Sequence, residues 1–189
     1  NNPKIISAKD SPEFAGAWKD GALRITARAC DWWDWKNDRG NGLYMTIDAT
    51  DVKAENAYVA FSFCGGQLLD AVKSVDYPSF WAVEYSFDGS IWKRLEDRSA
   101  TMHAMVWKAT RPINGLTYNL SGEVAMGFTE HMFVFPENIS GKPDVHVRIV
   151  PSSKNLATLS HKNSHMRANR PEYTPECTVN FGSIIVRYR

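Results

Sequence analysis

The chain has 189 residues, of which 43% are hydrophobic and 23% charged, so it is long enough to bury a core as one domain over residues 1–189. Its net charge of +1 gives no electrostatic reason to expect nucleic acid as a partner. No apolar run approaches the roughly 18 residues of a membrane-spanning helix, and the Asn1–Lys4 start lacks a signal peptide's apolar stretch, so we expect that an exported form would be a mature or trimmed chain.

Short alternating runs of apolar and polar residues predict strands along most of the chain. An apolar run predicts a first edge strand over Lys4–Ala8, and a loop containing Phe14 and Trp18 is expected before Ala22. Regular period-two alternation then predicts a strand that ends at Cys30. Further strands are expected over residues 43–47, 58–63, 102–109, 128–135, 144–150 and 178–189.

The stretch Phe80–Glu96 carries the clearest local signal. Trp81, Val83, Tyr85 and Phe87 alternate with other residues before an Asp-Gly pair, which predicts a β-hairpin. In the closing run, the pair at residues 182–183 shifts the alternation and predicts a β-bulge. The best helix candidate, residues 67–75, is short. Nine or ten short strands with little helix predict an all-β fold, a two-sheet antiparallel β-sandwich or jelly roll.

The hairpin also carries a family resemblance. Residues 83–92 read Val-Glu-Tyr-Ser-Phe-Asp-Gly-Ser-Ile-Trp, and residues 145–151 read Val-His-Val-Arg-Ile-Val-Pro. They resemble the V-x-Y-S-x-D-G-x-x-W … R-I-x-P signature of galactose-binding-like jelly rolls, which include discoidin (coagulation-factor C-type) domains. Residues 179–186 are similar to the closing strand of sandwich domains in secreted and surface proteins of glycan-degrading Bacteroidetes. The resemblance implies that Tyr85 and Trp92 pack in the core and that loops at one end bind ligands.

Catalytic motifs are absent from the sequence. There is no G-x-S-x-G, H-E-x-x-H, P-loop or Rossmann glycine pattern. Cys30, Cys64 and Cys177 show neither a CxxC pair nor zinc-finger spacing, which argues against a structural zinc site. Two interpretations of the cysteines remain open: buried apolar residues, or a disulfide between Cys30 and Cys64.

The segment Asp31–Gly42 combines three indoles with polar side chains. An indole can stack on the C–H face of a sugar ring while neighbouring polar groups bind its hydroxyls. Consecutive residues of an extended segment point opposite ways, so the indoles cannot all face the core. The sequence therefore predicts a ligand site with exposed indoles, made of Trp32, Trp33, Asp34, Trp35, Asn37, Asp38 and Arg39.

Two further hypotheses concern the loops. The same segment offers hard oxygen donors at Asp31, Asp34, Asn37 and Asp38, so a structural calcium ion is possible, although the spacing is not that of an EF-hand. The long polar connection Ser152–Cys177 could form a second ligand wall through Arg167 and Arg170.

We therefore expect a non-catalytic carbohydrate-binding module of a secreted or cell-surface bacterial protein, with no cofactor and with a glycan as its partner. One alternative is a structural or adhesive sandwich that makes protein contacts in a surface assembly. The other is a glycoside hydrolase whose acidic residues converge in a cleft, because such a pair needs only proximity in space.

Overall fold

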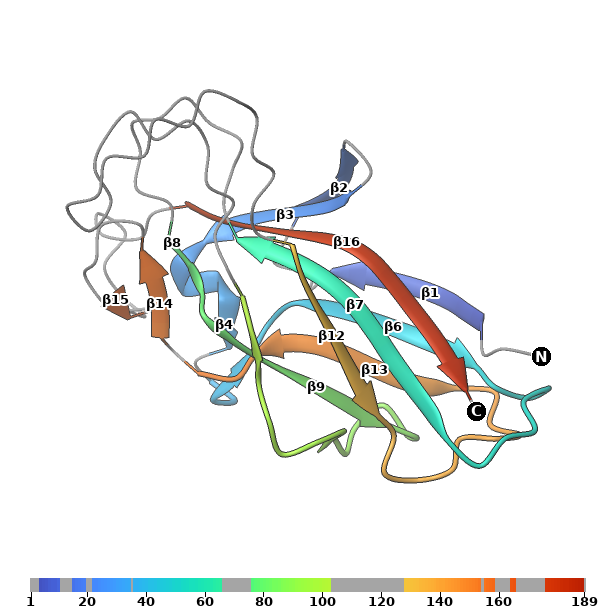
Figure 1. Cartoon of the computed structure of the whole chain (residues 1–189). Coiled ribbons are helices and arrows are strands. Elements are labelled where there is room, and N and C mark those ends of the chain that lie inside the picture. The colour runs from blue at the N-terminus through green and yellow to red at the C-terminus, as the bar shows by residue number, and fades with distance from the viewer. Residues whose placement is uncertain are drawn as a thin grey trace.

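The computed structural model describes residues 4–10, 15–19, 22–34, 36–65, 76–102, 128–153, 155–158, 164–165 and 176–188. These residues form two main sheets that pack face to face around a shared hydrophobic core (Figure 1). Neighbouring strands are antiparallel except for one short parallel pairing between Cys177 and Asp76. The prediction of an all-β sandwich is confirmed. None of the described helices is long and apolar enough to cross a membrane.

The first sheet has the strand order β1-β6-β13-β9-β10, with β11 pairing β9. Its strands are β1 (Lys4–Asp10), β6 (Leu43–Asp48), β13 (Val145–Pro151), β9 (Phe80–Ser86), β10 (Lys93–Arg94) and β11 (Ala100–Thr101). Strands β9 and β10 pair antiparallel with Lys93 opposite Tyr85, which confirms the predicted hairpin. Strand β13 lies between β6 and β9 and is hydrogen-bonded to both.

The second sheet has the order β12-β7-β16-β8-β14-β15, and β3 joins β16 and β2 at its side. Its strands are β2 (Ala15–Lys19), β3 (Ala22–Arg28), β7 (Ala57–Gly65), β8 (Asp76–Pro78), β12 (Thr129–Val134), β14 (Asn155–Thr158), β15 (Ser164–His165) and β16 (Glu176–Tyr188). The pairing of β16 with β7 shifts register between Phe181 and Ile184, so the predicted bulge is confirmed.

Some predictions for connecting segments were wrong. Residues Ala15–Lys19, expected in a loop, pair with β3 as strand β2. The expected long connection after Ser152 contains the short strands β14 and β15. The helix expected over residues 67–75 and most of the strand expected over residues 102–109 lie outside the described residues.

Aromatic rings dominate the core between the sheets. Phe63 and Phe181 stack at 6.0 Å between ring centroids, and both meet the Trp81 indole edge to face at 5.6 and 5.9 Å. Tyr85 is also buried, with 1% of its surface exposed, as the family resemblance implied. Cys64 is buried as well. Because the side chains of Cys30 and Cys177 lie outside the described part, their disulfide status stays a prediction.

Alternation along the strands of the first sheet separates two faces. On β13, Val145, Val147 and Ile149 are wholly buried in the core. The residues between them, His146 and Arg148, belong to the opposite, outer face, because successive side chains of a strand point to opposite sides. The outer face is therefore the surface on which this sheet presents polar chemistry.

Candidate functional site

The tryptophan-rich segment folds against the core. It forms a short 3-10 helix, η1 (Ala29–Trp32), and the two-stranded ribbon of β4 (Trp33–Asp34) and β5 (Arg39–Gly40). Trp32 is 0% exposed and meets Trp81 edge to face at 5.6 Å, while Trp33 is 8% exposed. The expectation that these two indoles are exposed for stacking was wrong, because both fill the end of the core. Trp35 lies outside the described residues.

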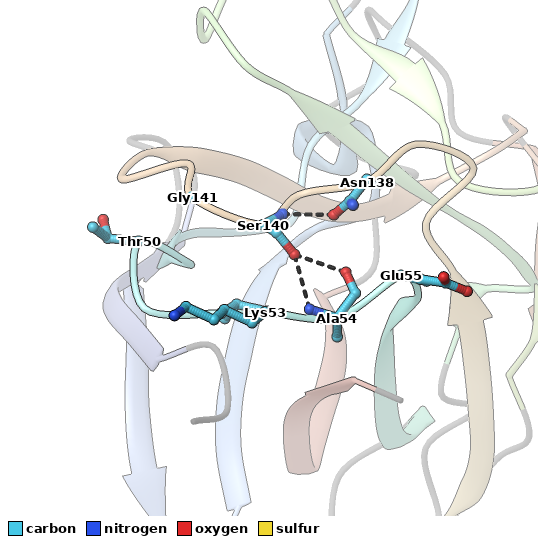
Figure 2. Close-up of a pocket in the computed structure, with 8 residues that line it drawn as sticks. Thr50, Lys53, Ala54, Glu55, Asn138, Ser140 and Gly141 are labelled. Atoms are coloured by element: carbon cyan, nitrogen blue, oxygen red, sulfur yellow. Dashed lines mark hydrogen bonds between the residues drawn. The ribbon is translucent and has the colours of Figure 1, made fainter.

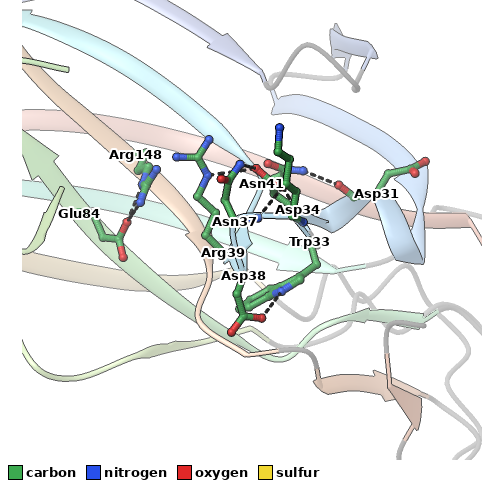
Figure 3. Close-up of polar contacts among 10 residues, drawn as sticks. Asp31, Trp33, Asp34, Asn37, Asp38, Arg39, Asn41, Glu84 and Arg148 are labelled. Atoms are coloured by element: carbon green, nitrogen blue, oxygen red, sulfur yellow. Dashed lines mark hydrogen bonds and ion pairs between the residues drawn. The ribbon is translucent and has the colours of Figure 1, made fainter. Parts of the chain in front are cut away.

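The polar residues of this segment hold the ribbon's turn (Figure 3). Asp34 Oδ1 accepts the backbone N–H groups of Lys36 and Asn37 at 3.1 Å, and its Oδ2 accepts the Asn37 amide at 2.7 Å. Hydrogen bonds from Asn37, with a smaller contribution from the charge of Arg39, lower the pKa of Asp34 below its usual value although partial burial opposes them. Asp38 Oδ1 accepts the Trp33 indole N–H at 3.2 Å.

The calcium hypothesis gains no support from this arrangement. Within the described ranges, no group of three or more His, Cys, Asp or Glu side chains is placed to hold a metal ion. The oxygens of Asp34 already accept three nitrogen donors and lie 3.3 Å from Arg39 Nε. The second ligand wall is not testable in the same way, because Arg167 and Arg170 fall outside the described residues.

A groove of about 520 Å³ lies on the outer face of the first sheet. Strands β6 and β13, the ribbon strand β5 and the connection between β9 and β10 all contribute to it. The residues that line it are Arg39, Tyr44, Met45, Thr46, Gly89, Trp92, His146 and Arg148. Of the predicted site residues that the structure describes, only Arg39 lines the groove; its other described lining residues were not predicted as ligand contacts.

Strand register builds the floor of the groove. Arg148 of β13 pairs with Tyr44 of β6 on one side and with Glu84 of β9 on the other. One pair further along, His146 lies opposite Thr46, and its Nδ1 is 3.5 Å from the Thr46 hydroxyl. These side chains share one face because alternate residues of a strand point to the same side, and so do residues directly opposite each other on neighbouring strands.

Arg148 is the most unusual group in the groove. It is only 5% exposed although it carries a charge. Its Nε and Nη2 both contact Oε2 of Glu84 at 2.5 Å, and its guanidinium lies over the Trp92 ring, 4.2 Å from the centroid. Among the residues that the structure describes, no acceptor meets the buried Nη1 atom. A buried cationic N–H without an acceptor costs free energy, so this atom is one hydrogen bond short.

Trp92 is placed by the turn that precedes it. Oδ1 of Asp88 accepts the backbone N–H groups of Ser90 and Ile91 at 2.8 Å, and Gly89 takes a φ of 72° that favours glycine. The half-buried Trp92 ring then lies edge to face with Tyr44 at 6.1 Å. The expectation that Trp92 packs in the core was wrong: it contacts Arg148 and Tyr44 at the groove.

A second, more open pocket of about 560 Å³ lies between the β6–β7 and β12–β13 connections (Figure 2). Its polar atoms hold the two loops together: the Ser140 hydroxyl donates to the Ala54 carbonyl at 2.7 Å, and the Ala54 N–H donates to Ser140 Oγ at 3.2 Å. Lys53 and Glu55 supply opposite charges, and none of its described lining residues is aromatic. It offers less to a ligand than the groove does.

Comparison with known proteins gives a likeness in architecture. No family model matches the sequence, and no curated protein is detectably similar to it. Among solved structures, the chain is similar to one described as "CBM4 structure and function", a carbohydrate-binding module, at 10% sequence identity and a TM-score of 0.46. That similarity covers 96% of this chain and 78% of the other.

The sequence did contain a signal for the groove. Tyr44, His146 and Arg148 stand at the polar positions of alternating strands, where an exposed face is the ordinary interpretation. An aromatic and an arginine at such positions are candidates for a binding face, because exposed aromatic and arginine side chains are enriched at recognition sites. Only the register between three distant segments shows that they meet.

Proposed function

We propose that this protein is a non-catalytic carbohydrate-binding module that holds a glycan in the groove of the first sheet. The single observation that carries the proposal is the cluster of Trp92, Tyr44 and Arg148: two aromatic rings beside a guanidinium fixed by Glu84. This cluster combines apolar ring surface with oriented hydrogen-bond donors, which is the chemistry of a sugar site.

The roles of the residues follow from their chemistry. The half-buried rings of Trp92 and Tyr44 offer apolar surface to the C–H face of a sugar. Arg39, His146 and Thr46 line the same groove and have polar groups for sugar hydroxyls. Affinity is expected to be modest, because a sugar exchanges hydrogen bonds with water for hydrogen bonds with protein. The similarity of residues 179–186 to the closing strand of sandwich domains in secreted and surface proteins of Bacteroidetes supports a setting in a secreted or cell-surface bacterial protein.

A glycan array followed by affinity gels tests the proposal. We expect the protein to be retarded by at least one polysaccharide, and Trp92→Ala to abolish that retardation. Ile91→Ala is the matched control, because Ile91 belongs to the same turn, is 67% exposed and does not line the groove. Equal retardation of the wild-type protein and Trp92→Ala would remove the groove as the site.

The alternative of a structural module has one observation in its favour. Met132 of β12 and Ile185 of β16 lie in one cross-strand row on either side of Ala60, and they are 51% and 37% exposed. Among the described residues, nothing shows what would cover them. The groove has a defined chemistry, so carbohydrate binding is the function that the geometry supports best.

A further inference from the structure

The charges around the groove are unevenly placed. Of the groove's lining residues that the structure describes, Arg39, His146 and Arg148 are basic and none is acidic. The two acids that pair with the arginines, Asp34 and Glu84, do not line the groove. A ligand that enters the groove therefore meets basic groups first, although the protein as a whole has a net charge of only +1.

Arg39 remains available to a ligand. Its side chain is 43% exposed, and its contact with Asp34 Oδ2, at 3.3 Å, uses Nε. The outer nitrogens of its guanidinium are therefore not needed for that ion pair. The Arg39 and Arg148 guanidinium groups lie near each other above the strands in Figure 3. Each guanidinium group is a planar set of donors, and this shape suits an oxyanion.

Arg148 adds an unfilled hydrogen-bond site. Both of its contacts to Glu84 fall on one oxygen, Oε2, and the described residues offer its Nη1 no acceptor. The Trp92 ring lies over this guanidinium and Nη1 is buried, so a ligand oxygen can reach Nη1 only after a covering side chain such as Trp92 has shifted. An anionic oxygen is the strongest acceptor for such a donor, since charge-assisted hydrogen bonds are about twice as strong as neutral ones.

We infer that the groove selects glycans that carry an anionic group, a carboxylate or a sulfate ester, over the corresponding neutral glycans. This inference rests on the proposed function, because it names the class of sugar bound at the same site. Arg39 attracts the anion, and Arg148 binds it once the Trp92 ring has shifted. The neutral glycan lacks the charge to which these groups are complementary.

The test uses two matched pairs of ligands. One pair is an oligogalacturonate and the same oligomer with its carboxylates reduced to alcohols; the other is a sulfated oligosaccharide and its desulfated form. Calorimetric titrations at low and high salt give each Kd. We expect the anionic member of at least one pair to bind ten times more tightly or better, with an advantage that shrinks at high salt because exposed charges are screened. The pair that shows this advantage identifies the anion.

Three variants separate the contribution of Arg39 to binding from that of Trp92. Arg39→Gln is expected to remove most of the advantage of the anionic ligand, so that in this variant the Kd of the anionic ligand approaches that of its neutral partner. Trp92→Ala is expected to weaken binding of both. Lys53→Gln removes a cation of the second pocket and serves as the charge-matched control, with no expected change. A change of tryptophan fluorescence in the wild-type protein, absent from Trp92→Ala, would report the shift of the ring.

The failures are distinguishable. Equal affinity within both pairs, or an advantage that Lys53→Gln reduces as much as Arg39→Gln does, overturns this inference and leaves carbohydrate binding in place. Binding of neutral glycans alone on the array also overturns it. If no glycan of either kind binds, the proposed function itself fails.

Discussion

Arg148 and Glu84 form an ion pair that is almost removed from water, with side chains 6% and 18% exposed. Removing two charges from water costs free energy, and only good ion-pair geometry offsets that cost. Here Nε and Nη2 of Arg148 both contact Glu84, while the buried Nη1 has no acceptor among the described residues. The stability that the pair provides is therefore open to a direct test.

Glu84→Ala tests the strength of this pair. We expect it to lower the free energy of unfolding by about 3 kcal/mol, because the buried Arg148 guanidinium loses its counter-ion. Denaturant titration measures this, with Lys93→Ala as the control: that lysine is 59% exposed and pairs with Glu137 in water, so its removal should change stability little. Equal losses in the two variants would show that burial does not strengthen the first pair.

Tyr85 provides a prediction for alkaline pH. Burial, the hydrogen bond that its hydroxyl donates to Glu137 at 2.6 Å, and the charge of that carboxylate raise the pKa of Tyr85 to about 12. Because the folded pKa exceeds the unfolded value, the stabilising contribution is complete below about pH 10 and is lost as the pH rises toward 12. Unfolding titrations between these pH values should show a slope in the wild-type protein.

Tyr85→Phe should lack that alkaline slope. It should also lose about 1–3 kcal/mol at neutral pH, because a buried hydrogen bond to a charged acceptor is removed. A variant with the same alkaline slope as the wild-type protein would mean that another group is responsible.

At the scale of elements, the connection between β9 and β10 is held by one carboxylate. The backbone N–H groups of Ile91 and Ser90 and the Ser86 hydroxyl lower the pKa of Asp88 well below its usual value. Because the pKa of Asp88 is lower in the folded state than the unfolded value of about 4, its ionised carboxylate stabilises the folded state above about pH 4. This contribution is lost as the pH falls. We expect Asp88→Ala to lower the Tm at neutral pH and to weaken glycan binding by displacing Trp92.

The matched control for that change is Asp97→Ala, because Asp97 is an exposed acid of the next connection. Between pH 3 and 7, the Tm should fall less with acid in Asp88→Ala than in Asp97→Ala, because Asp88→Ala has already lost the hydrogen bonds that depend on the ionised Asp88 carboxylate. Identical acid profiles would contradict the assigned role of Asp88.

The ribbon strand β5 depends on the absence of a side chain. A Cβ atom at Gly40 would lie 2.2 Å from the carbonyl oxygen of Pro151 in β13, so Gly40→Ala must push β5 away from the sheet. We expect a loss of about 1–3 kcal/mol in stability and weaker glycan binding, since Arg39 is the neighbouring residue. Unchanged unfolding and unchanged binding would show that the ribbon is not seated as described.

How far the sequence predicts these elements depends on the kind of signal. Period-two alternation predicts β6, β9 and β13 because a half-buried strand must alternate, and the disrupted alternation at Gly182 predicts the bulge. The same reasoning failed for Trp32, where an indole among acids suggested a surface loop. Its burial depends on packing against Trp81, which belongs to a distant segment.

For the whole molecule, binding and stability are coupled through the first sheet. The groove is lined by residues of β6 and β13, which also carry the core. A ligand that binds only the folded state stabilises it by about 2.7 kcal/mol at a concentration of 100 Kd. A bound anionic glycan should therefore raise the Tm of the wild-type protein in scanning calorimetry, and it should not raise that of Trp92→Ala. An equal rise in both would place binding elsewhere.

The groove could not be predicted from local sequence patterns, for a physical reason. Tyr44, Glu84 and Arg148 come from three strands far apart in sequence, and they meet because the strands pair in one register. Each residue alone is an ordinary polar-face residue. Their cooperation is a property of the pairing, which no local pattern records.

The alternation of core-facing and groove-facing residues along β13 also affects how this protein can evolve. Val145, Val147 and Ile149 are constrained by the core, whereas His146 and Arg148 line the groove and, under the proposed function, are constrained by its ligand. A saturation library over residues 145–149 should therefore show folding selection at odd positions and ligand selection at even ones, with Arg148 subject to both because of its ion pair. Such a strand lets specificity diverge by substitution at His146 while the scaffold is inherited unchanged.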